Sequence, residues 1–237
     1  MKSKVMKTGI AVVLTLMSVA SMSEVKAQNT DIQNTQLYKL YQMKYVFGRK
    51  YNDVDVSKDA LYSMIAMDPN DDSLKMVLCY YYFDQNQFAS SLFVSLDLLS
   101  RNPDNEDALR INAMSYENMG VRDKAIDAYE SLYLKTSEVT LLYQAAMLQF
   151  ELERYNECKS SLDILLKDPQ AKAIKLSFAK NETEQQEVTL EAAAYNMKGM
   201  LEKQQGNKAD AKTYFEKALE VNPEFVLASQ NLQDVVK

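Results

Sequence analysis

The chain has 237 residues with 27 basic side chains, 33 acidic side chains and no histidine, so its formal net charge is −6. A chain this acidic has no general attraction to nucleic acid or to anionic lipid. The lack of histidine removes the commonest metal ligand and the commonest general base at neutral pH, and the five glycines and four prolines favour a nearly all-helical protein.

Residues 1–27 have the pattern of a secretory signal peptide. Three early lysines precede an uncharged, mostly apolar stretch over residues 8–23, and Ala27 offers a small residue before a cleavage point at Gln28. An uncleaved membrane anchor is the alternative, although the stretch is short for a span of about 20 residues. The residue directly after the cleavage point is glutamine and not cysteine, so we expect no lipid anchor and no stable membrane insertion after cleavage. The mature protein is then expected outside the cytoplasm, in the periplasm or secreted.

Residues 32–69 form the least regular unit, which we interpret as a degenerate first repeat. Its first helix is expected to end near Gly48, and a polar loop follows from Arg49 to Asp55. The second helix is expected from about Val56 to Met67, with apolar side chains on one face.

The next three units are regular and cover residues 72–105, 106–137 and 139–169. Each pairs two amphipathic helices, with small residues 12 positions apart where the helices cross. The crossing pairs are Cys79 with Ser91, Ala113 with Ala125, and Ala146 with Cys158. The two cysteines are therefore expected to be buried in different units, and we expect no disulfide between them.

The period breaks over residues 170–190. Ile174, Leu176 and Phe178 alternate with polar residues, which is typical of a strand, and 187–190 could be a returning strand. We interpret the segment as an inserted β-hairpin. A longer helix preceded by a disordered loop is the alternative, because two-stranded hairpins are marginally stable alone.

The last unit covers residues 192–225, with Gly199 and Ala211 at the crossing, and a capping helix is expected over 223–237. A helix-turn-helix unit that recurs every 33 or 34 residues resembles the tetratricopeptide repeat. Lys198 and Glu202 depart from the family pattern, which usually has apolar or aromatic residues there. The resemblance implies an all-α fold, a right-handed α-α superhelix that makes residues 28–237 a single domain.

The resemblance also implies that the first helices of the units line a concave surface where ligands bind. Fixed steps around each crossing residue place ten side chains on that face. They are Met76, Tyr80, Phe83, Arg110, Met114, Tyr143, Met147, Phe150, Asn196 and Met200. Methionine and aromatic residues are common at peptide-binding surfaces, and Arg110 could hold a carboxylate or a carbonyl of an apolar or mildly acidic segment. The alternative is that these side chains pack against neighbouring helices as core.

No phosphate-binding loop, catalytic triad or metal-ligand cluster is present in the sequence, so we expect no enzyme activity, cofactor or metal. We predict a non-enzymatic scaffold of the bacterial cell envelope that binds a protein or peptide, and no nucleic acid. The alternative is an extracytoplasmic accessory protein that binds a nutrient or glycan. The sequence leaves the partner and the oligomeric state open.

Overall fold

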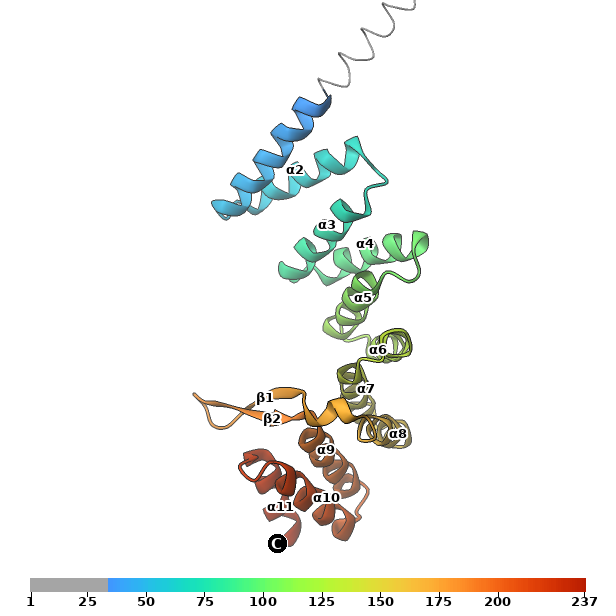
Figure 1. The fold of residues 1–237 in the computed structure, drawn as a ribbon, viewed down its shortest axis with the longest axis vertical. Coiled ribbons are helices and arrows are strands. Elements are labelled where there is room, and N and C mark those ends of the chain that lie inside the picture. Colours follow the sequence, from blue (N-terminus) through green and yellow to red (C-terminus); the bar gives the residue numbers. More distant parts are fainter. Residues whose placement is uncertain (1–33) are drawn as a thin grey trace, which may run out of the picture. The chain divides into compact units, whose positions relative to one another are not determined.

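The computed structural model describes residues 34–237, which are mostly helical (Figure 1). These residues form two compact units, 34–78 and 79–237, which divide within α3 (Asp72–Asp84). Helices pack in successive pairs, which confirms the predicted all-α fold class. The predicted signal peptide lies outside the described residues. None of the described helices is long and apolar enough to cross a membrane.

The first unit pairs the helix over residues 34–50 with α2 (Val54–Met67). Gly48 lies at their contact, where an added Cβ atom would be 2.5 Å from Ser57 Oγ. The first helix ends at residue 50, two residues after Gly48, and the loop that follows is shorter than the predicted stretch from Arg49 to Asp55. The loop is correspondingly short, since Asp53 caps α2 by accepting a hydrogen bond from Val56 N at 3.1 Å.

The second unit contains the end of α3 and a series of helices with one small sheet. These elements are α4 (Phe88–Arg101), α5 (Glu106–Asn118), α6 (Arg122–Thr136), α7 (Val139–Glu151), α8 (Tyr155–Leu165), the 3-10 helix η1 (Pro169–Lys172), β1 (Lys175–Ala179), β2 (Gln185–Thr189), α9 (Leu190–Gln204), α10 (Lys208–Val221) and α11 (Val226–Val236). Each helix from α4 to α8 packs against the next one, and so does each helix from α8 to α11. The core therefore runs along the series of pairs within this unit.

A residue in the left-handed backbone conformation recurs in the turn inside each helix pair. These residues are Asn52, Asn86, Gly120, Glu153 and Gly206, all with φ between 57° and 84°. They are 34, 34, 33 and 53 residues apart, which is the spacing of the predicted repeats with the insertion included. Only two of the five are glycine, so the recurring turn has no single-residue signature in the sequence.

The small residues predicted at the helix crossings are buried where the helices meet. Ala113 and Ala125 are fully buried, and Ser91 Oγ donates a hydrogen bond to the carbonyl of Cys79 at 2.9 Å. Both cysteines are buried free thiols, as predicted. Burial raises the pKa of Cys79 to about 11, although a hydrogen bond between its thiol and Ser91 opposes the rise, and burial alone raises the pKa of Cys158 to about 12.

The segment between α8 and α9 contains the predicted hairpin, seen beside α9 in Figure 1. β1 and β2 are antiparallel, with Leu176 opposite Val188 and Phe178 opposite Gln186. Val188 is buried, and the ring centroid of Phe178 lies 5.1 Å from that of Phe225. The hairpin is stable here because its apolar face packs on the neighbouring helices.

The last helix begins later than predicted. α11 starts at Val226, with Phe225 at the N-cap position, and the Asn222 side chain accepts hydrogen bonds from the backbone nitrogen and hydroxyl of Thr189. Thr189 in turn caps the start of α9. The predicted boundaries of a single repeat domain over residues 28–237 stay a prediction.

Candidate functional site

A cavity of about 410 Å³ lies in the second unit between α5 and α7, which are the first helices of two successive pairs. Side chains from α5, α6, the start of α7 and the residue before it line this cavity. They are Arg110, Met114, Glu117, Asn118, Tyr129, Glu138, Thr140, Leu141 and Gln144. Arg110 and Met114 are two of the ten residues predicted for the binding face.

Arg110 is held by an acidic residue of the next pair. Its guanidinium donates to Glu138 Oε2 at 2.7 Å, and Thr140 Oγ1 donates to the other oxygen of that carboxylate at 2.7 Å. Partial burial favours a higher pKa for Glu138, but the two hydrogen bonds and the charge of Arg110 outweigh it, so the pKa of this carboxyl is lowered. Glu138 therefore stays ionised and largely neutralises Arg110.

Tyr129 and Glu117 form a second polar pair in the cavity wall. The buried Tyr129 hydroxyl donates to Glu117 Oε2 in a short hydrogen bond. Burial, and then the Glu117 carboxylate, raise the pKa of Tyr129, so the hydroxyl remains a donor at neutral pH. The pair links α5 to α6 and fixes one wall of the cavity.

The lining combines an excess of negative charge with neutral groups that can bind a backbone. One cation, Arg110, faces two carboxylates, Glu117 and Glu138. The Gln144 amide makes no hydrogen bond to another described residue and can both donate and accept. Met114 and Leu141 supply apolar surface. This arrangement suits a ligand with peptide groups and a cationic or neutral side chain.

The predicted site residues of α3 lie outside this cavity. Met76 is half-buried in the first unit. Tyr80 is 40% exposed, and burial and its hydrogen bond with Asp107 raise the pKa of its hydroxyl. Phe83 packs edge-to-face on Phe88, with ring centroids 5.2 Å apart.

The predicted residues of α7 and α9 are mostly packing partners. Tyr143 and Asn196 are only 6% and 3% exposed, so little of their surface is open to a ligand. Asn196 accepts a hydrogen bond from Asn231 Nδ2 at 2.9 Å. The remaining residues of this group, Met147, Phe150 and Met200, are partly buried against core clusters. The binding role of the ten residues stays a prediction.

Sequence reasoning did not select Glu117, Tyr129, Glu138, Thr140 or Gln144. A signal existed for Glu117, because it stands four residues after Ala113, as Phe83 and Phe150 stand four residues after their crossing residues. The others were harder to find, since Tyr129 belongs to a second helix and Glu138 precedes a helix. Within the described residues, no group of acidic or cysteine side chains could hold a metal ion.

Comparisons with known proteins bear on the fold. The tetratricopeptide-repeat family profile matches residues 192–225. No curated protein matches the chain. Three similar crystal structures share its fold and have low sequence identity to it.

A tetratricopeptide repeat protein from Parabacteroides merdae has a TM-score of 0.62 and 19% identity, and the match covers 84% of this chain and 72% of that protein. MamA has a TM-score of 0.61 and 15% identity, with 79% and 92% covered. YrrB, described as a tetratricopeptide-repeat protein with an unusual peptide-binding site, has a TM-score of 0.61 and 11% identity, with 81% and 90% covered. The chain thus contains a tetratricopeptide repeat at residues 192–225 and has the fold of tetratricopeptide-repeat proteins.

Proposed function

We propose that the chain is a non-enzymatic scaffold of the bacterial cell envelope that binds a protein or peptide at the cavity between α5 and α7. The observation that carries the proposal is the lining of this cavity, which joins the first helices of two successive pairs and presents both peptide-binding and charged groups. The fold shared with YrrB, which has a peptide-binding site, supports the same class of ligand. Because the identity is 11%, we assign no residue of this chain a role from that protein.

The bound segment is extended and carries a lysine or arginine side chain. Gln144 pairs with its backbone, Met114 and Leu141 contact its apolar side chains, and the cationic group approaches Glu117 and Glu138. An acidic segment fits less well, because its carboxylate would have to displace Glu138 from Arg110. This reverses the charge preference that the sequence predicted from Arg110 alone.

The envelope setting rests on the sequence pattern of residues 1–27. Expression in a bacterial host followed by intact-mass measurement of the exported protein tests it. We expect a chain that begins at Gln28. A mass that retains residues 1–27 would rule out cleavage at this site and favour the membrane-anchor alternative.

Affinity capture from the native envelope tests the binding site. The double variant Met114→Ala/Gln144→Ala should lose most captured partner, whereas the matched variant Met119→Ala/Gln87→Ala, which changes the same residue types at exposed sites outside the cavity, should not. Partners retained equally by both variants would exclude this cavity. Synthetic peptides that differ only in a central lysine or glutamate then test the charge preference.

A further inference from the structure

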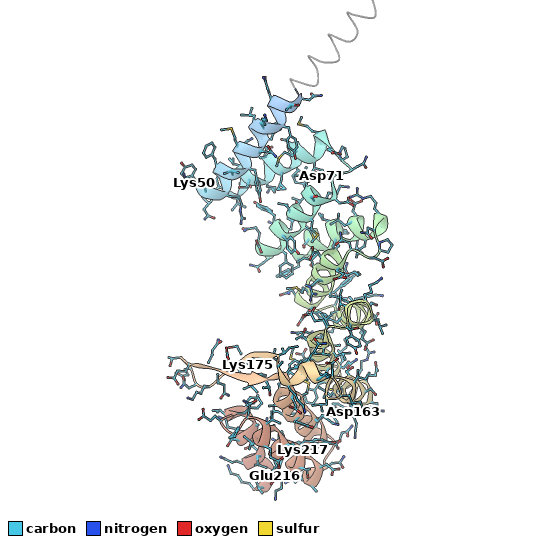
Figure 2. All side chains as sticks on the ribbon, viewed as in Figure 1. Lys50, Asp71, Asp163, Lys175, Glu216 and Lys217 are labelled. Carbon is cyan, nitrogen blue, oxygen red and sulfur yellow. The ribbon has the colours of Figure 1, made fainter. Side chains whose placement is uncertain are left out.

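The helix over residues 34–50 differs in charge from the rest of this acidic chain. It contains four cations, Lys39, Lys44, Arg49 and Lys50, and no acidic residue, although the whole chain has a net charge of −6. Lys44 forms an ion pair with Asp59 of α2. The other three cations are exposed, and Lys50 lies at the end of the helix in Figure 2. The helix over residues 34–50 is therefore locally basic, although the chain as a whole is acidic.

The exposed face of the same helix carries a row of large apolar side chains. Leu40, Met43 and Phe47 follow each other at steps of 3 and 4, so they lie on one side of the helix. They are 58%, 55% and 47% exposed. The opposite side packs on α2, where Gly48 meets Ser57. We call Leu40, Met43 and Phe47 the apolar row.

Exposed lysines border the apolar row on one side. At 100° per residue, Lys39 and Lys50 project to that side, whereas Lys44 projects to the other side and is held by Asp59 of α2. A row of apolar side chains bordered by lysines is the pattern of a helix that lies in a membrane interface, where the apolar groups enter the lipid and the cations meet phosphates. Lysine stems can extend along the apolar surface while their charges reach the headgroups.

We propose that this helix attaches the protein to the surface of an anionic phospholipid bilayer. Charge complementarity selects this occupant over a second copy, because two copies meeting at the apolar row would bring the exposed Lys39 and Lys50 of each copy together. The predicted cleavage point before Gln28 is six residues from Asn34, which is a reach of at most about 22 Å for an extended chain. The helix is thus close to a bilayer during export. The proposal does not depend on the α5–α7 cavity and involves no membrane-spanning helix.

Vesicle sedimentation tests the proposal with the chain from Gln28, so that the apolar stretch before it cannot contribute. Vesicles of equal parts phosphatidylglycerol and phosphatidylcholine should bind the protein, and phosphatidylcholine alone should bind it far more weakly. High salt should weaken the binding. Because each basic residue near such a surface contributes about fivefold in partitioning, K39Q/K50Q should lose about 25-fold. L40Q/M43Q should lose binding through the apolar row.

Matched controls separate this surface from general effects. K124Q/K208Q removes two exposed cations from the second unit, and Leu134→Gln changes an exposed leucine of α6. Both should bind anionic vesicles as the unchanged protein does. Absence of vesicle binding, or equal losses in the controls and the test variants, would overturn the proposal. Self-association lost in L40Q/M43Q without vesicle binding would assign the row to a second copy instead.

Discussion

Two regions of the second unit use charged side chains in opposite ways. Between α5 and α7 the charges of Arg110, Glu117 and Glu138 line an open cavity. Between α8, α9 and α10, by contrast, Lys198 and Glu202 are buried and matched by protein groups. The difference teaches that a charged residue on the first helix of a pair lines a cavity only when the neighbouring helices leave it accessible.

The buried region shows how such matching is achieved. Lys198 Nζ forms a short ion pair with Asp163 of α8 and lies 4.6 Å from the centroid of the Tyr214 ring. Glu202 accepts hydrogen bonds from Lys159 Nζ at 2.9 Å and from Asn207 Nδ2 at 2.8 Å. The two residues that depart from the family pattern therefore link α9 to α8 and leave no unpaired charge buried.

The largest loss of folding stability is expected from Asp163→Ala. This change leaves the buried Lys198 ammonium without its carboxylate, which costs about 3 kcal/mol of unfolding free energy, at the low end for a broken buried pair because Asp163 is half-exposed. Chemical denaturation measures the loss. The exposed Asp127→Ala is the control and should change stability little. If the two variants are equally stable, the ion pair between Lys198 and Asp163 does not stabilise the fold.

Gly199→Ala tests the packing beside this charged region. An added Cβ atom would lie 2.5 Å from the Phe215 ring, which is fully buried and cannot move aside freely. Overpacking should cost about 1–3 kcal/mol in denaturation experiments. Adding Phe215→Leu to the variant should recover part of the loss by making room. A double variant whose losses simply add would show that the two residues are not in contact.

The pH dependence of stability should reveal the contribution of the buried Glu202. Burial favours a higher pKa for Glu202, but hydrogen bonds from Asn207 and Lys159 outweigh it and lower the pKa below its ordinary 4.5. Glu202 therefore adds stability above pH 4.5, and this stability is lost as the pH falls through the lowered folded-state pKa. Glu202→Gln should flatten this acid limb of a denaturation series. An unchanged acid limb would contradict the assignment.

Glu138→Gln in the cavity should have the smallest effect on stability. The Arg110–Glu138 pair is half-exposed, and such pairs contribute about 0–1 kcal/mol. The change should nevertheless alter binding, because it frees Arg110 for a ligand carboxylate. Peptide titrations should then show a shift from lysine-containing to glutamate-containing peptides. A large stability loss with no change in peptide preference would show that the Arg110–Glu138 pair has a structural role, like the ion pairs of α9.

The sequence was sufficient for features that depend on local spacing. The 12-residue separation of Ala113 and Ala125 predicted their burial, and the alternation around Leu176 predicted the hairpin. The loop after the first helix was predicted too long, because the spacing of apolar residues does not reveal that the chain turns at Asn52 in the left-handed conformation. These errors concern boundaries rather than the kind of element.

The candidate site was less predictable because it depends on distant side-chain pairs. Arg110 and Glu138 are 28 residues apart, and the periodicity of one helix does not reveal that they meet. In the same way, Lys198 and Glu202 were recognised as unusual, but their partners Asp163 and Lys159 lie 35 and 43 residues away. Residue spacing along one helix identified the face, whereas packing between helix pairs determines which side chains on that face remain accessible to a ligand.

The hairpin is a place where the chain can accept insertions. Leu190 N donates to the carbonyl of Ile174 at 2.8 Å, so the inserted segment leaves the stack and returns at nearly the same place. α9 still packs against α7 and α8 despite the insertion. Because the entropy of closing a flexible loop rises by only about 0.6 kcal/mol per doubling of its length, the tip over 180–184 can be extended at little cost. This tip is a natural point for acquiring new sequence without disturbing the helix pairs on either side.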